Sequence, residues 1–139
     1  MIIEKLPQAY VHQTVALQQQ IVPYPIDTDA AAALYQTMQY RNDCCVLVAR
    51  DDETIHGTVS GFCCHGLAGS FLAIEDLIVR EELRGSGIGT KLMAAIHEFG
   101  KTSGCGYAIL VSSGFRKQAH KFYEKMGYTE DVRGFRKDL

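Results

Sequence analysis

The chain has 139 residues, of which 47% are hydrophobic and 22% are charged, with a net charge of −2. This length predicts one domain covering residues 1–139, and the composition excludes a disordered chain. The longest apolar runs are only of strand length, which excludes a membrane span. The first residues also lack the pattern of a secretory signal, so a cytoplasmic location is expected.

The charges are unevenly distributed. Residues 1–100 hold 6 basic and 12 acidic side chains, whereas residues 101–139 hold 8 basic and 4 acidic ones, so the net charge changes from −6 to +4. The basic end suits the phosphates of a small molecule or a solvated helix face, and the two readings have equal weight. An acidic, tryptophan-free chain without a basic run is not expected to bind nucleic acid.

The cysteines predict neither a metal site nor a disulfide framework. They are five in number, which excludes complete pairing, and they form neither a CxxC motif nor a Cys/His pair at zinc spacing. We interpret them as small buried thiols in a reducing compartment. They are Cys44, Cys45, Cys63, Cys64 and Cys105.

The first half of the chain predicts a strand, two helices and two further strands. Residues 2–6 are strand-like, and apolar residues then recur at helical spacing from Tyr10 to Ile21, before two prolines. A second helix is expected after Asp27 or Thr28, with the buried stripe Ala30, Leu34 and Met38. Residues 44–50 and 54–65 predict an antiparallel hairpin.

A third strand, residues 71–79, is apolar on both faces apart from Glu75 and Asp76, which places it in the middle of a sheet. The alternation puts Glu75 on one face with Phe71, Ala73, Leu77 and Val79, and puts Leu72, Ile74 and Ile78 on the other.

The second half predicts a helix, a strand, a helix and a terminal strand. The first helix carries the stripe Ile88, Leu92, Ile96 and Phe99 and ends near Gly100 to Gly104. Residues 107–111 form the next strand, a helix runs through Ala119 and Phe122 to Gly127, and a last strand closes the chain. The expected fold class is α/β, with a mixed, mostly antiparallel sheet flanked by helices.

A glycine-rich turn joins the third strand to the following helix. Glycines at 85, 87 and 89 allow a ligand to approach the backbone, and the N–H groups of the first helical turn favour an anion, with Arg84 as an added cation. The alternative is a flexible turn, which does not require three alternating glycines. The spacing matches neither a dinucleotide-binding fingerprint nor a P-loop.

This turn resembles the R/Q-x-x-G-x-G/A signature of the GNAT superfamily of acyl-CoA N-acyltransferases, at Arg84, Gly87 and Gly89. The resemblance implies the GNAT fold, in the order strand, two helices, three strands, helix, strand, helix and strand. It also implies that acetyl-CoA pairs its pantetheine amides with the backbone of the preceding strand. The implied binding residues are Leu77, Ile78, Val79, Arg84, Gly85, Ser86, Gly87, Ile88, Gly89 and Thr90.

A second segment, residues 119–128, resembles the A-x-x-x-Y-x-x-x-G-[FY] helix of the same family. There the tyrosine protonates the departing thiolate of CoA, so the resemblance implies that Tyr123 is the general acid. The alternative is a core tyrosine at helical spacing. Many family members carry Asn seven residues earlier, where this chain has Arg116, which could instead meet CoA phosphates.

Glu75 is the predicted general base, because a lone carboxylate on an apolar strand face has a raised pKa. Asp76 is the alternative. The acceptor amine would attack the acetyl carbonyl directly in a ternary complex, without a cysteine nucleophile, while backbone N–H groups of the central strand polarise that carbonyl. No metal is required.

The expected acceptor is the primary amine of a small molecule, bound near Tyr24, Tyr35 and residues 112–115. Residues 113–123 resemble small-molecule acetyltransferases of bacteria. Two alternatives remain: acetylation of a protein's lysine or N-terminus, which would need an open peptide groove, and a non-catalytic module that binds acyl-CoA. Neither nucleic acid nor a membrane is an expected partner, and a homodimer is left open.

Overall fold

The computed structural model describes residues 1–112 and 117–139. The chain divides into two compact units, Met1–Ile109 and Leu110–Leu139. Its elements are β1 (Ile2–Lys5), η1 (Gln8–Tyr10), α1 (Val11–Gln18), α2 (Thr28–Met38), β2 (Cys44–Asp51), β3 (Thr54–Gly66), β4 (Gly69–Val79), η2 (Glu81–Leu83), α3 (Ile88–Thr102), β5 (Tyr107–Leu110) and α4 (Lys117–Lys125).

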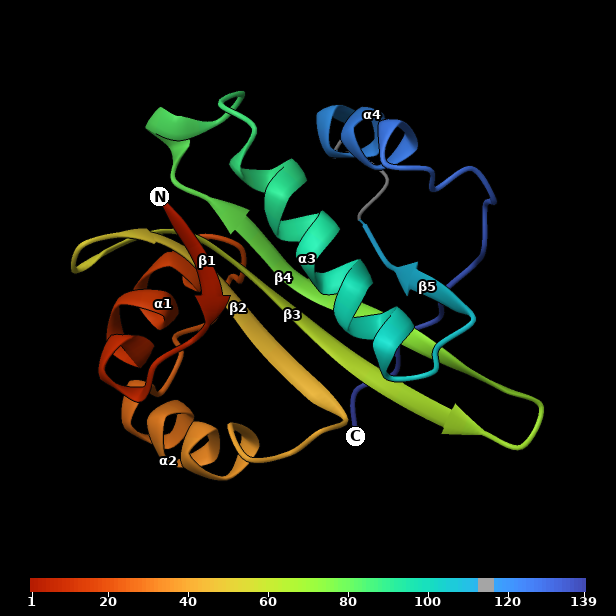
Figure 1. Cartoon of the computed structure of the whole chain (residues 1–139), viewed down its shortest axis with the longest axis horizontal. Coiled ribbons are helices and arrows are strands. Elements are labelled where there is room, and N and C mark those ends of the chain that lie inside the picture. Colours follow the sequence, from red (N-terminus) through yellow and green to blue (C-terminus); the bar gives the residue numbers. More distant parts are fainter. Residues whose placement is uncertain (113–116) are drawn as a thin grey trace. The chain divides into compact units, whose positions relative to one another are not determined.

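One sheet with the strand order β1-β2-β3-β4-β5 organises the first unit. The first four strands pair antiparallel. β5 begins beside the start of β4: the N–H of Gly106 donates to the carbonyl of Ser70 at 2.9 Å, and the rings of Phe71 and Tyr107 stack 5.4 Å apart. Both contacts follow the same sequence order, so β4 and β5 run parallel (Figure 1). The mixed sheet flanked by helices confirms the predicted fold class.

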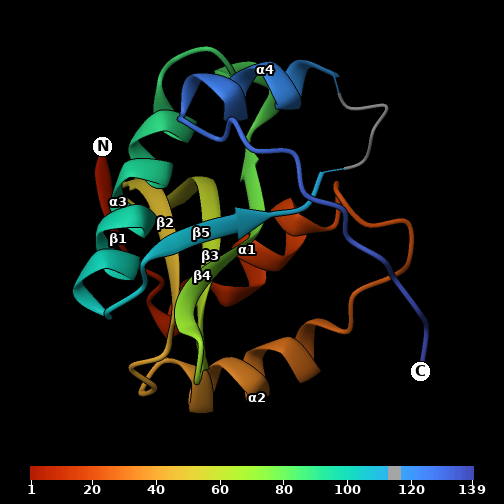
Figure 2. The ribbon, with the colours of Figure 1, turned by 90° about the vertical axis from the view of Figure 1, so that its right-hand side faces the viewer.

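Helices cover both faces of this sheet. α1 and α2 lie on one face, and α3 lies on the other (Figure 2). The cluster beneath α1 and α2 contains Leu6, Val11, Val15, Leu17, Tyr35, Val46, Val48, Ile55 and Ile78. The face beneath α3 buries Leu72 and Ile74 of β4 against a helix whose residues Leu92, Met93 and Ile96 are fully buried.

α3 lies very close to the sheet because two glycines leave room for it. A Cβ atom on Gly61 of β3 would approach the side chain of Ile96 to 2.7 Å, and one on Gly57 would meet Leu92 at 3.0 Å. Both distances are too short for an ordinary contact between carbon atoms. The stripe predicted from Ile88, Leu92 and Ile96 is therefore confirmed, and it packs directly on strand backbone.

The buried stripe of α2 differs from the prediction. Leu34 is 61% exposed and Ala30 is also exposed, whereas Tyr35 is 4% exposed and packs with Ala31 and Met38. The Tyr35 hydroxyl donates to the carbonyl of Leu6 at 2.5 Å, so its polar end is satisfied inside the core. The expected stripe was therefore wrong by one residue at two of its three positions.

The predicted terminal strand is absent from residues 129–139 as the structure describes them. This segment carries a charge at six of its eleven positions, and its apolar residues are exposed, with Val132 at 52% and Phe135 at 91%. It therefore has no alternating apolar face to pair with a sheet. α4, by contrast, covers much of the helix expected before Gly127.

Candidate active site

A β-bulge interrupts β4 at the carboxylates singled out in the sequence. Ser60 of β3 pairs with Glu75 and Thr58 pairs with Ile78, so the two residues Asp76 and Leu77 lie opposite the single residue Val59. Asp76 has φ of 56°, in the left-handed region. Aspartate tolerates this region better than most residues do, so its identity fits the bulge.

The bulge changes which side chains share a face. Directly paired residues of antiparallel strands lie on the same face, and β3 itself continues without interruption from Thr58 to Ser60. Glu75 and Ile78 therefore share the face that α1 and α2 cover. Val79 pairs with Gly57, whose Cα faces α3, so Val79 lies on the opposite face. The strict alternation predicted for residues 71–79 is wrong beyond Glu75, because the extra residue reverses it.

The carboxylates of Asp76 in the bulge and of Glu75 beside it hold their protons more tightly than usual. Desolvation is the main cause of the raised pKa of Glu75, and the neighbouring Asp76 carboxylate adds to it. Burial alone raises the pKa of Asp76. Glu75 nevertheless belongs to the exposed residues of β4, whereas Asp76 is half-buried. Glu75 thus combines access to solvent with a raised pKa, as the prediction of a general base requires.

The glycine-rich turn has left-handed backbone at two of its three glycines. Gly85 has φ of 82° and Gly87 has φ of 91°, and Gly87 is the N-cap of α3. A Cβ atom at either position would meet nothing within 4 Å, so the backbone conformation, rather than crowding, selects glycine at both positions. The turn is exposed from Arg84 to Gly87, and the N–H groups of the first helical turn begin immediately after it.

Hydrogen bonds attach this turn to the sheet and to itself. Arg80 donates from its backbone N–H to the carbonyl of His56 at 2.9 Å and from Nε to the carbonyl of Ile55 at 2.7 Å. Nε of Arg84 donates to the carbonyl of Val79 at 3.3 Å. Within the turn, Oγ of Ser86 donates to the carbonyl of Leu83 at 2.5 Å. The predicted residues 77–79 and 84–90 are therefore held in one continuous strand-turn-helix unit.

Tyr123 lies on α4, in the second unit. The N–H of Tyr128 donates to the carbonyl of Tyr123 at 3.1 Å, and the N–H of Gly127 donates to that of Glu124 at 3.0 Å. With Gly127 at φ of 94°, these two bonds form a Schellman motif. The Tyr123 ring meets the Tyr128 ring edge to face, with centroids 6.2 Å apart. Tyr123 therefore has a structural part in ending α4, whatever its chemical role.

The residues expected to bind the acceptor are not all available for that purpose. Tyr35 is buried and its hydroxyl is engaged by Leu6, so the expectation that it meets the acceptor is wrong. Tyr24 is 56% exposed, so the prediction that it meets the acceptor stands as a prediction. Residues 113–116, including Arg116, lie outside the described residues.

Sequence reasoning missed the bulge and an aromatic pair near the start of β4. Asp76 carried one signal, because an aspartate inside an apolar strand is a candidate for left-handed backbone. The stack of Phe71 on Tyr107 depends on the parallel pairing of two strands that lie far apart in the sequence, and no local pattern indicates it.

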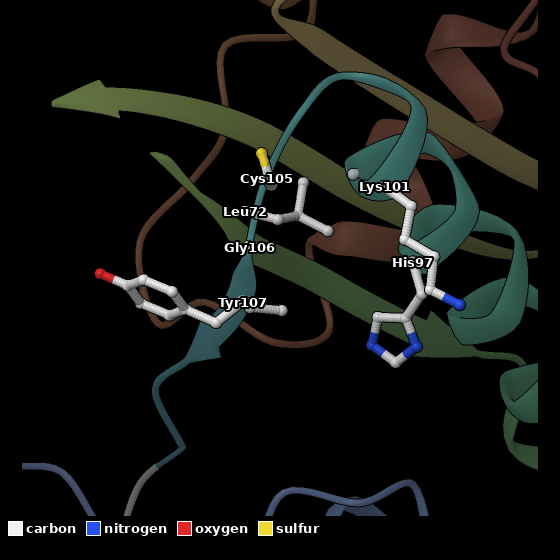
Figure 3. Close-up of a pocket in the computed structure, with 8 residues that line it drawn as sticks. Leu72, His97, Lys101, Cys105, Gly106 and Tyr107 are labelled. Atoms are coloured by element: carbon white, nitrogen blue, oxygen red, sulfur yellow. The ribbon is translucent and has the colours of Figure 1, made fainter. Parts of the chain in front are cut away.

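A small cavity of about 200 Å³ lies between α3 and the start of β5 (Figure 3). Its lining includes Leu72, His97, Lys101 and Cys105. Burial, with the Lys101 ammonium as a second cause, lowers the pKa of His97. None of these residues belongs to the predicted site.

Comparison with known proteins identifies the class to which this strand-turn-helix unit belongs. The model of the acetyltransferase (GNAT) family matches residues 11–128. The chain therefore belongs to the GNAT family, which confirms the resemblance carried by Arg84, Gly87 and Gly89.

Particular relatives are similar over part or all of the chain. A glucosamine 6-phosphate N-acetyltransferase of Trypanosoma brucei brucei is 38% identical over 66 residues, which cover 48% of this chain and 43% of that protein. The match thus spans less than half of the relative's own length. A putative acetyltransferase from Agrobacterium tumefaciens has a TM-score of 0.88 at 20% identity, covering 100% of both chains. Glucosamine-6-phosphate N-acetyltransferase from Arabidopsis thaliana has a TM-score of 0.86 at 23% identity, covering 99% of this chain and 97% of that one. These two similarities show the fold.

Within residues 1–112 and 117–139, no helix is both long and apolar enough to cross a bilayer.

Proposed function

We propose that the chain is an N-acetyltransferase that moves the acetyl group of acetyl-CoA onto the primary amine of a small molecule. The observation that carries this proposal is the turn after β4, where two left-handed glycines lead into the N-terminus of α3. Membership in the GNAT family supports it. In this proposal residues 1–139 form one catalytic domain. A cytoplasmic location and a homodimer remain expectations.

The turn fits the pyrophosphate of CoA chemically. Open space above Gly85 and Gly87 leaves room for phosphate oxygens, and the first-turn N–H groups of α3 would donate to them. The positive end of the helix dipole and the exposed Arg84 add favourable charge. In this proposal residues 84–90 hold the pyrophosphate, and the backbone of residues 77–79 holds the pantetheine arm.

Acetyl-CoA supplies a thioester whose carbonyl carbon accepts a nucleophile. The Glu75 carboxylate would accept a proton from the incoming ammonium, directly or through a water. The neutral nitrogen then forms a C–N bond to the acetyl carbon as the C–S bond breaks. The thiolate takes a proton to give free CoA, and the second proton that the nitrogen loses returns to the donor. The products are thus an acetamide, CoA and one proton held at Glu75.

Tyr123 is proposed as the donor of the proton that the thiolate takes. A phenol hydroxyl is a suitable donor near a thiolate leaving group. This assignment rests on the family pattern A-x-x-x-Y-x-x-x-G-[FY] in residues 119–128. Backbone N–H groups at the bulge, where Asp76 and Leu77 lie opposite one residue of β3, are the proposed donors to the acetyl carbonyl oxygen.

The names of two similar proteins favour a small-molecule amine as the acceptor. The relatives from Trypanosoma brucei brucei and Arabidopsis thaliana are both named as N-acetyltransferases of glucosamine 6-phosphate, a small amine. They support the proposed class of acceptor over a protein lysine or N-terminus.

The test is release of free thiol from acetyl-CoA in the presence of a panel of amines, with the acetylated product identified by mass. Acetyl transfer to at least one small amine, dependent on Glu75, is expected. Tight CoA binding with no transfer to small amines or to peptides would favour the non-catalytic module. Transfer to peptides alone would favour the protein acetyltransferase.

A further inference from the structure

An apolar strip runs from Glu75 along the face of the sheet that faces away from α3. Phe71, Ala73 and Glu75 alternate along β4, so all three share this face. Phe71 and Ala73 belong to the partly exposed residues, and neither is part of the core cluster beneath α1 and α2. The strip is therefore partly open to solvent and lies outside that core cluster.

Neighbouring strands widen the strip on both sides. Phe62 of β3 pairs with Ala73, which places Phe62 on the same face. On the other side, Tyr107 of β5 stacks on Phe71 with an angle of 16° between the rings, and it is 57% exposed. Figure 3 shows the Tyr107 side chain directed away from His97 and Lys101 of α3. Ile109, two residues after Tyr107, continues along β5 on the same face.

The strip has a carboxylate at one end and an aromatic pair at the other. Four residues of extended strand separate Phe71 from Glu75, which corresponds to about 13 Å. The small side chain of Ala73 lies between them, with the ring of Phe62 beside it. Apart from Glu75, the side chains of the strip are uncharged, so its charge complementarity is to a cation at the Glu75 end.

We propose that this strip binds the acceptor, and that the acceptor is a primary amine carried on an extended apolar chain that ends in an aromatic ring. The inference rests on the proposed acetyl transfer and names its class of substrate. The ammonium lies at Glu75 and the terminal ring packs on Phe71 and Tyr107, because flat rings stack favourably on aromatic side chains. A sugar phosphate would place its charged group against apolar side chains and is disfavoured.

The acceptor series consists of benzylamine, 6-phenylhexylamine and glucosamine 6-phosphate, each assayed with saturating acetyl-CoA. 6-Phenylhexylamine should have a kcat/KM at least about 10-fold above that of benzylamine, because only the longer chain brings its ring to the aromatic pair. Glucosamine 6-phosphate should be the poorest of the three. Equal values for the two aryl amines, or preference for the sugar phosphate, would overturn the proposal.

Variants at Tyr107 separate binding from folding. Tyr107→Ala should raise KM for 6-phenylhexylamine by about 10-fold with little change in kcat or in KM for benzylamine. Tyr107→Phe keeps the ring and should restore the wild-type KM. Tyr40→Ala is the control, because Tyr40 is also exposed, at 84%, but lies beyond the end of α2. If another part of the chain covers the strip, Tyr107→Ala will instead lower Tm and affect all three amines equally, which would overturn the proposal.

Calorimetry of 6-phenylhexylamine in the absence of acetyl-CoA separates this inference from the proposed function. Suppose that none of the amines releases thiol but 6-phenylhexylamine still binds, and that Tyr107→Ala weakens this binding about 10-fold. The strip is then the binding site for the amine, and the proposed acetyl transfer is wrong. Acetyl transfer that does not depend on Tyr107 would support the proposed function but overturn the proposal that the strip binds the acceptor. If neither transfer nor binding occurs, both are wrong.

Discussion

Glu75 and Ile78 share one face of the sheet although they are three positions apart in β4. In a regular strand, residues separated by an odd number of positions point to opposite faces. The bulge at Asp76 and Leu77 reverses the alternation, so that Ile78 packs beneath α1 and α2 while Glu75, earlier on the same strand, stays exposed on that side. The candidate base is thus anchored close to a fully packed core.

Glu75→Gln should lower kcat/KM by about 10²- to 10⁴-fold, and the loss should be larger at about pH 6.5 than at about pH 9. At the lower pH more of the acceptor is an ammonium ion, so the reaction depends more on a base. Desolvation and Asp76 raise the pKa of Glu75, so wild-type activity should fall as the pH drops through that raised value. The measurement is a pH–rate profile with CoA affinity as control; a profile unchanged in Glu75→Gln but lost in Asp76→Asn would identify the other carboxylate as the base.

Asp76→Asn should raise Tm at neutral pH. Burial raises the pKa of Asp76 in the folded state, so the folded protein favours the protonated form. The contribution of this group to stability is full below its unfolded pKa and is lost as pH rises through the folded pKa. An uncharged asparagine, which also tolerates left-handed backbone, removes that loss. Thermal melts should differ by about 1–3 °C at pH 7 and converge near pH 3; a lower Tm for the variant at pH 7 would contradict the prediction.

Gly87→Asp should weaken CoA binding by at least about 10-fold, because the new carboxylate lies where the pyrophosphate is expected and repels it. Gly104→Asp is a matched control at the other end of α3. Gly104 has φ of 86° against 91° for Gly87, and a Cβ atom there would also meet nothing within 4 Å. Both variants should therefore carry similar backbone strain, the helix dipole should make the Gly104 variant the less stable of the two, and only the Gly87 variant should lose CoA affinity. Equal CoA affinity by calorimetry would exclude the turn as the phosphate site.

Tyr123→Phe should bind acetyl-CoA normally and reduce kcat by about 10²- to 10⁴-fold. Phenylalanine keeps the ring that meets Tyr128 at the end of α4, so Tm should stay close to the wild-type value. Tyr128→Phe is the matched control. Burial, with Tyr123 as a second cause, raises the pKa of Tyr128 to about 12, so its hydroxyl is a poor proton donor and its loss should leave kcat unchanged. A wild-type kcat together with a lower Tm would show that Tyr123 is a structural tyrosine.

Tyr35→Phe should lower stability by about 1–3 kcal/mol, because the buried carbonyl of Leu6 would lose the hydroxyl that donates to it at 2.5 Å. Tyr35 was expected near the acceptor, so the variant also tests that correction. KM for amines should not change. A raised KM with an unchanged Tm would restore Tyr35 to the acceptor site.

The sequence was a good guide where local chemistry determines the backbone. The glycines at 85 and 87 indicated the turn, and the stripe Ile88, Leu92 and Ile96 indicated the helix after it. Prediction was weaker where the outcome depends on packing. In α2, Leu34 and Tyr35 are adjacent, and hydrophobicity alone predicted that the leucine is the buried residue. Only Tyr35 can also donate a hydrogen bond to the Leu6 carbonyl.

Long-range pairing was the other source of error. Whether β4 contains an extra residue depends on its register with β3, and nothing within residues 71–79 determines that register. A terminal strand was expected to close the chain, but residues 129–139 are too highly charged for one. The chemical roles of Glu75, Tyr123 and the turn residues remain predictions.

The contact of α3 with bare strand backbone has a mechanical consequence. Ile96 rests against Gly61, and Leu72 of β4 lies where a Cβ atom on Gly100 would approach it to 2.8 Å. A methyl group at either glycine would push the C-terminal half of the helix away from the sheet. α3 is one continuous helix of 15 residues, so such a push would be expected to tilt its other end as well. The direction of the first-turn N–H groups thus depends partly on Gly61 of β3 and Gly100 of α3, and a substitution at either would reorient these groups without touching the turn.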